Sequence, residues 1–218
     1  AATFTNFAMS GIDKLHFGLE AAVSIPLYRS LALNGAVSWG QYTYDSNPYY
    51  LQTQDNSGDI VSDGYVYWKD FRVESTPQTA VNVGLSWRSN NNIYLSADFN
   101  YYNNMYLSMS PIYRTDAVIT GGMAPGDIEH LRRQEKFDSA YTLNASIGKN
   151  WYIHRKYTLG FSLDVKNILN NQDIKTGGYE QTRLSKNTET TVTTYQAFDS
   201  KYFYMFGTTY YLNLYFRF

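Results

Sequence analysis

Cysteine is absent from the 218 residues, and strong charge and long apolar runs are absent with it. Without cysteine the chain can form no disulfide, no thiolate metal site and no thiol nucleophile. No run reaches 18 consecutive apolar residues, which excludes a transmembrane helix. The net charge of −1 creates no bulk field that would attract nucleic acid. Charged residues make up 17%, below the quarter that is typical of a soluble domain.

Tyrosine is abundant, with 22 residues, and it lies within a regular alternation of apolar and polar side chains. A period of two residues predicts β-strands. It recurs in seven segments: 15–25, 31–39, 81–88, 93–102, 141–148, 157–166 and 210–218. No segment has the period of a helix, and residues 1–13 indicate a loop.

The predicted strands are about 9–13 residues long, whereas strands of globular proteins average about 5–6. A tilted strand needs about 9–11 residues to cross a bilayer. A closed sheet can turn an apolar face to lipid and still satisfy every backbone hydrogen bond. The pattern therefore predicts an all-β, transmembrane, antiparallel up-and-down β-barrel. A soluble sandwich or lipocalin-like barrel remains an alternative, because alternation does not say which face lies outside. In the barrel, the lumen-facing residues would include Asn82, Asp98, Asn100, Asn144, Asp164 and Asn213.

Short and long connections alternate between these strands. The short ones are 26–29, 88–92 and 150–156, and the long ones are 44–78, 104–139 and 167–200. Short periplasmic turns and long external loops are typical of outer-membrane barrels. Aromatic residues gather at the strand ends, which predicts two girdles at the membrane interfaces. One girdle is Trp87, Trp151, Tyr152, Tyr157, Phe216 and Phe218 at the short-turn end; the other is Trp39, Tyr42, Tyr44, Tyr101 and Tyr102.

The long loops hold the candidate ligand-binding residues. Tyr49, Tyr50, Tyr65, Tyr67 and Trp68 lie among amides and carboxylates, a combination that suits sugars or flat chelates. The alternative is a loop that folds around its own aromatic side chains.

The second long loop carries Tyr113 and Arg114, and also Arg132 and Arg133, which could bind an anionic ligand or a lipopolysaccharide phosphate. A solvated face is the alternative for these cations. In the third long loop, the residues alternate around the sequence SKNT (185–188), which predicts a hairpin with its turn there.

No combination of residues favours an enzyme. His16, His130 and His154 lie on different predicted elements, and no G-x-S-x-G nucleophile motif is present. Asp98 and Asp164 could pair as catalytic carboxylates, but separate strands and a polar face favour solvated or ion-paired roles. The sequence DNSGD (55–59) lacks the later bidentate acid of a calcium loop and predicts a turn. We therefore predict no catalysis, no metal and no cofactor.

Three stretches resemble the C-terminal third of TonB-dependent outer-membrane receptors of the Bacteroidota type. They are FTNFAMSGIDKLHFGLEAAV (4–23), STPQTAVNVGLSWRSNNNIYLSADFNYYNNMYLS (75–108) and FSLDVKNILNNQDIKTGGYEQTR (161–183), the last with an N-[IL]-[LF]-N-N signature. The order and spacing of these stretches carry the resemblance, which covers nearly all of the chain. The stripe of Tyr210, Leu212, Leu214, Phe216 and Phe218 resembles the signal read by the barrel-assembly machinery.

The resemblance implies a plugged barrel of about 22 strands, of which this chain supplies about seven. It also implies import of a scarce nutrient (a siderophore, vitamin, glycan or peptide) across the bacterial outer membrane, without covalent chemistry. Residues 1–218 would be one segment without the plug. Its partners would be the rest of the barrel and the plug, TonB through that plug, membrane lipid and lipopolysaccharide, with a surface lipoprotein as a further candidate.

The expected number of strands is odd, which leaves two unpaired strand edges. An open edge cannot face lipid, so an odd count indicates either a further strand within residues 1–13 or a segment of a larger barrel. Because residues 1–13 indicate a loop, we favour the segment. The alternatives are a small self-contained barrel that acts as an adhesin or passive pore, and an outer-membrane enzyme.

Overall fold

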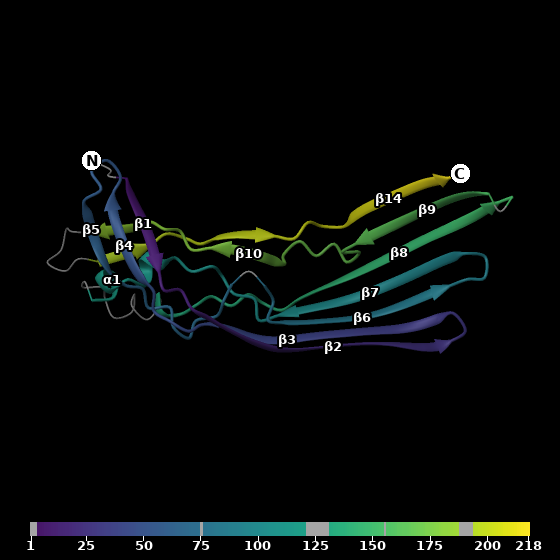
Figure 1. The fold of residues 1–218 in the computed structure, drawn as a ribbon, viewed down its shortest axis with the longest axis horizontal. Helices are drawn as coiled ribbons and strands as arrows, with labels where there is room; N and C mark the ends of the chain where they lie inside the picture. The colour runs from purple at the N-terminus through teal and green to yellow at the C-terminus, as the bar shows by residue number, and fades with distance from the viewer. Residues whose placement is uncertain (1–3, 75, 121–130, 155, 188–193) are drawn as a thin grey trace.

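The computed structural model of the protein describes residues 4–74, 76–120, 131–154, 156–187 and 194–218. It is built almost entirely of antiparallel β-structure, as the alternation predicts. The molecule is elongated, with one long sheet at one end and the long connections gathered at the other (Figure 1).

The principal sheet has seven strands in the order β14-β9-β8-β7-β6-β3-β2. Its strands are β2 (Lys14–Tyr28), β3 (Leu31–Tyr44), β6 (Thr79–Arg88), β7 (Ile93–Asn103), β8 (Ala140–Ile153), β9 (Tyr157–Lys166) and β14 (Thr209–Arg217). All seven predicted strands are confirmed, and every neighbouring pair is antiparallel.

The strand register keeps apolar residues on one face across the whole sheet. One row of directly opposed residues consists of Leu95, Ile147, Leu163 and Leu212. A register slip of one residue in any strand would break this row, because side chains alternate between faces. The sequence pattern and the pairing therefore agree on a single continuous apolar face.

The opposite face is polar and carries its own cross-strand hydrogen bonds. Asn82 Nδ2 donates to Asn100 Oδ1 at 2.8 Å, and Asn100 Nδ2 donates to Thr142 Oγ1 at 3.4 Å. Glycine makes room for aromatic rings on this face, since a Cβ on Gly148 would lie 2.1 Å from Cζ of Tyr94 on the neighbouring strand. The six residues predicted on the polar face all lie there.

The sheet is open. Within the described residues, no strand pairs with the outer edge of β2 or with the outer edge of β14. Both edge strands run in the same direction, toward the short turns (Figure 1). This follows from seven strands that alternate in direction, because the first and the seventh must then be parallel.

Shorter elements form within the long connections. A three-stranded sheet has the order β1-β4-β5, with β1 (Thr5–Ser10), β4 (Tyr49–Gln54) and β5 (Ile60–Tyr65). Two hairpins pair β10 (Lys175–Tyr179) with β13 (Lys201–Tyr204), and β11 (Leu184–Asn187) with β12 (Thr194–Ala197). A 3₁₀-helix, η1 (Pro111–Arg114), precedes the short helix α1 (Asp116–Thr120).

Several expectations for these connections need correction. Residues 1–13 were expected to be a loop, but Thr5–Ser10 form β1, because this strand pairs with the distant β4. No helix was expected, yet η1 and α1 are present; Pro111 favours the start of η1, where an N–H donor is not needed.

Two smaller expectations are met in whole or in part. The turn expected at DNSGD is confirmed, since Gly58 N donates to Gln54 O at 2.9 Å between β4 and β5. The hairpin expected in the third loop is confirmed, but residues 185–187 of the SKNT sequence belong to β11, and Thr188 lies outside the described residues.

Candidate functional site: the long-loop assembly

The buried core of the molecule lies among its long connections. We call this region the long-loop assembly: β1 and the described residues between β3 and β6, between β7 and β8, and between β9 and β14. Every buried hydrophobic side chain of the described residues lies in this assembly or at the strand ends that join it. The assembly is thus a packed structure, which gives it the rigidity that a binding surface needs.

The first core cluster consists of Tyr44, Tyr50, Val66, Trp68 and Met109. Tyr50 is 1% exposed and stacks on Phe7, and Trp68 is 6% exposed and packs against Tyr44. Two of the predicted ligand-binding aromatics, Tyr50 and Trp68, are therefore interior residues, as in the alternative of a loop folded around its own aromatics. Tyr44 was expected in an interface girdle, but it is buried in this cluster. The reason is that β3 extends into the assembly and ends at Tyr44, whose ring packs against Trp68.

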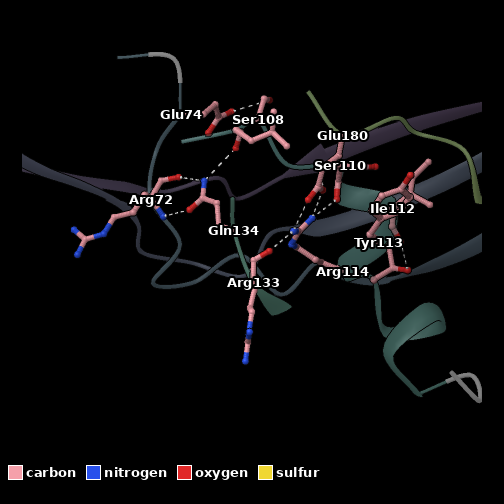
Figure 2. A network of polar contacts seen from close by, with 12 residues as sticks. Arg72, Glu74, Ser108, Ser110, Ile112, Tyr113, Arg114, Arg133, Gln134 and Glu180 are labelled. Atoms are coloured by element: carbon pink, nitrogen blue, oxygen red, sulfur yellow. Dashed lines mark hydrogen bonds and ion pairs between the residues drawn. The ribbon is translucent and has the colours of Figure 1, made fainter. Parts of the chain in front are cut away.

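A buried ion pair joins two of the long loops (Figure 2). The Arg114 guanidinium is 1% exposed, and its two terminal nitrogens donate to the carboxylate of Glu180 at 2.5 and 2.9 Å. Glu180 also accepts a hydrogen bond from Ser110 N at 2.8 Å. The Arg114 guanidinium also lies over the ring of Phe71, 5.4 Å from its centroid. Phe71 belongs to the long loop between β3 and β6, so Arg114 contacts all three long loops. Arg114, predicted to bind ligand, instead ties three loops together.

Tyr113 is buried beside this pair. Its hydroxyl donates to Arg183 O at 2.9 Å, and its ring packs with Val118 and Leu131. Burial raises the pKa of Tyr113 above its ordinary value, because the phenolate would lose its hydration. Tyr113 is therefore a core residue, and its buried side chain cannot contact a ligand directly in this structure.

Arg132 and Arg133 lie at the surface, where a ligand or lipid phosphate could reach them. The carbonyl oxygen of Arg133 accepts a hydrogen bond from Arg114 at 3.5 Å, so the exposed segment is fastened to the buried pair (Figure 2). Their predicted anion-binding role stays a prediction.

Sequence reasoning missed the polar residues that hold the assembly together. Gln134 accepts from Arg72 N at 2.8 Å and donates to Arg72 O at 2.7 Å, as one strand would to another (Figure 2). Glu74 accepts from the Tyr44 hydroxyl at 3.0 Å and from Ser108 Oγ at 3.3 Å. No local pattern marks these residues, because their partners lie 30 or more positions away along the chain.

The N-I-L-N-N signature forms the point where β9 leaves the sheet. Asn167 is 3% exposed and has a φ of +51°, a backbone conformation that Asn tolerates better than most residues. Its Nδ2 donates to Asn171 O at 2.9 Å and to Phe206 O at 3.0 Å. The signature thereby fixes the third long loop at both of its ends, next to β9 and next to β14.

Three of the predicted aromatics remain at the surface. Tyr49, Tyr65 and Tyr67 are 40%, 52% and 41% exposed. The Tyr49 hydroxyl donates to Asp63, and the Tyr67 hydroxyl donates to Asp116 Oδ1 at 2.5 Å. These hydrogen bonds raise the pKa of both tyrosines. We call these five residues the tyrosine face.

The polar face of the sheet brings few ionisable groups together. Asp98 opposes Asn144 on β8, and Asp164 opposes Ser146 on that same strand, so β8 separates the two carboxylates expected as a possible pair. The apolar stripe of β14 (Tyr210, Leu212, Leu214 and Phe216) and Phe218 are exposed. Their role in assembly stays a prediction.

The described residues contain no group of three or more His, Cys, Asp or Glu side chains that could hold a metal ion, and His130 lies outside them. Among the same residues, no helix has the length and apolar character to cross a membrane. No protein-family model matches the chain, and no curated protein or solved structure matches it significantly.

Proposed function

We propose that the chain is a wall segment of an outer-membrane β-barrel that imports a nutrient, with the long-loop assembly outside the cell. One observation carries the membrane part of this proposal: the apolar face of the seven-stranded sheet is uncovered across its width. Leu19 near one edge and Leu214 at the other are each 70% exposed, and Phe99 in the middle is 42% exposed. A soluble sandwich buries such a face against a second layer, whereas a barrel wall turns it to lipid.

The direction of the edge strands supports a barrel larger than this sheet. Because β2 and β14 run the same way, antiparallel closure requires an odd number of additional strands. A second copy in the same orientation would place β14 beside β2 of its partner as a parallel pair. The additional strands therefore come from a different segment, which favours the receptor barrel over a self-contained adhesin or pore.

The import function rests on the resemblance of the three stretches to TonB-dependent receptors, since the wall alone fits any large barrel. A plug held by the additional strands would connect the ligand to TonB, and the chain itself performs no covalent step. The packed, externally placed long-loop assembly fits the first contact with a ligand. An outer-membrane enzyme is less favoured, because the sequence carries no G-x-S-x-G nucleophile motif.

Cysteine labelling tests the orientation of the sheet, and these 218 residues contribute no cysteine of their own to the background. The variants are Leu163→Cys and Leu95→Cys on the apolar face, with Ser162→Cys and Ser96→Cys as neighbours on the polar face. In intact cells, we expect a water-soluble maleimide to label the serine positions and to leave the leucine positions unlabelled until detergent is added. Labelling of the leucine positions alone would mean that the apolar face is turned away from lipid.

A further inference from the structure

Three residues of the tyrosine face, Tyr49, Asp63 and Tyr65, lie on the outer side of the three-stranded sheet. Tyr49 and Tyr65 are opposed in the strand register, and Ser10 of β1 continues the row. The other side of the sheet carries Tyr50 and Met9, which pack into the first core cluster. Tyr49 and Tyr65 therefore point away from the core, and nothing in the described residues covers their exposed rings.

The rings of this face are held in place. Asp63 accepts from Tyr49, and the two carboxylate oxygens of Asp116 accept from the Tyr67 hydroxyl and from Tyr65 N. The ring of Tyr49 meets the ring of Tyr65 edge to face, with centroids 5.7 Å apart. Such fixed aromatic surfaces lose little conformational freedom when a ligand binds.

The charge around these rings has one sign. The hairpin from Tyr49 to Tyr67 contains Asp55, Asp59 and Asp63 and no Lys, Arg or His, and Asp116 packs against it. The nearest basic residue along the chain is Lys69, two positions after the hairpin. The two ion pairs described in the structure, Arg114 with Glu180 and Lys175 with Glu135, use other carboxylates. The face thus presents aromatic rings in a negative field.

We propose that the tyrosine face binds a basic peptide, with a Lys or Arg side chain against the ring of Tyr65 and the carboxylate of Asp63 as its counter-charge. A cation is attracted by the ring quadrupole and by the carboxylates together. A sugar would also stack on tyrosine, but a neutral sugar gains no charge–charge attraction from the carboxylates around these rings, whereas a cation does. This inference rests on the proposed function, because it names the ligand class of the long-loop assembly.

Fluorescence anisotropy on the detergent-solubilised protein tests this inference. The probes are a labelled Lys- and Arg-containing hexapeptide, a Glu-containing hexapeptide of the same length, and a linear oligosaccharide. We expect binding of the basic peptide alone, with an affinity that falls as salt is added, since exposed charges are screened. Tyr65→Leu should weaken this binding about tenfold, because it removes the ring, and Tyr65→Phe should retain it.

The variant Asp63→Asn tests the contribution of the negative charge separately. Its amide oxygen can still accept the hydrogen bond from the Tyr49 hydroxyl, but the carboxylate charge is lost. We expect it to weaken the basic peptide severalfold, whereas the control Asp138→Asn, an exposed carboxylate elsewhere in the assembly, leaves binding unchanged. Preference for the oligosaccharide, or peptide binding that ignores both Tyr65→Leu and Asp63→Asn, would overturn the inference. Either result leaves the membrane proposal standing, since cysteine labelling of the sheet tests that independently.

Discussion

At the scale of single residues, two adjacent glycines in β10 have different requirements. A Cβ on Gly178 would lie 2.3 Å from the carbonyl oxygen of Lys201, and its φ of +156° is rare for other residues. A Cβ on Gly177 would find its nearest neighbour at 3.5 Å, an ordinary contact with Phe203. The close approach of the two backbones in this hairpin therefore depends on one glycine of the pair.

This difference gives a matched test. We expect Gly178→Ala to destabilise the β10–β13 hairpin by about 1–3 kcal/mol, the usual cost of a strained backbone position. Gly177→Ala should change its stability by less than about 1 kcal/mol, because the new methyl group meets no backbone. Hydrogen exchange of the β10 and β13 amides would measure both. Equal protection in the two variants would show that the hairpin adjusts freely around Gly178.

At the scale of elements, the ion pair of Arg114 in η1 with Glu180, the residue after β10, is a buried polar connection between two long loops. Removal of one partner would leave a buried charge without compensation. We expect Arg114→Met or Glu180→Gln alone to lower the free energy of unfolding of the assembly by about 3–5 kcal/mol. The double variant should lose less than the sum of the two, as partners in direct contact do.

Limited proteolysis of the loops and urea unfolding would measure this coupling. The control is Lys175→Met, which breaks a pair with Glu135 whose side chains are 31% and 37% exposed. Because solvent screens that pair, its loss should cost no more than about 1 kcal/mol. Additive effects of the two Arg114–Glu180 changes would contradict the role of the pair in joining the loops.

The sequence predicts the strands of the wall far better than the structure of the assembly. Alternation within nine to fifteen residues is a local signal, so it locates β2, β7 and β14 without knowledge of their neighbours. The position of Arg114 depends on Glu180, which lies 66 residues away, and β1 exists because β4 pairs with it. Burial of Tyr50 and exposure of Tyr49 likewise follow from that pairing, so adjacent tyrosines could not be separated into core and surface beforehand.

At the scale of the whole molecule, the two open edges make a prediction about the isolated chain. The 218 residues expressed alone should not form a closed monomeric barrel, because seven alternating strands cannot close with antiparallel pairing. After refolding in detergent, we expect boiled and unboiled samples to migrate alike in gel electrophoresis, or as larger species that pair through the edges. A compact monomer whose migration changes on boiling would refute the edge argument.

The separation between an uncovered sheet and a packed assembly has a thermodynamic consequence. The assembly keeps its apolar side chains from water by itself, whereas the apolar face of the sheet is uncovered. In the proposed membrane setting, the surrounding hydrocarbon would keep water from that face. If the sheet is the proposed barrel wall, the two regions respond to different variables: acyl-chain length and bilayer thickness act on the sheet, and aqueous denaturant and temperature act on the assembly. We then expect the chain to unfold in two transitions, one for the sheet and one for the assembly. The two-state treatment used for small soluble domains does not apply to such a chain.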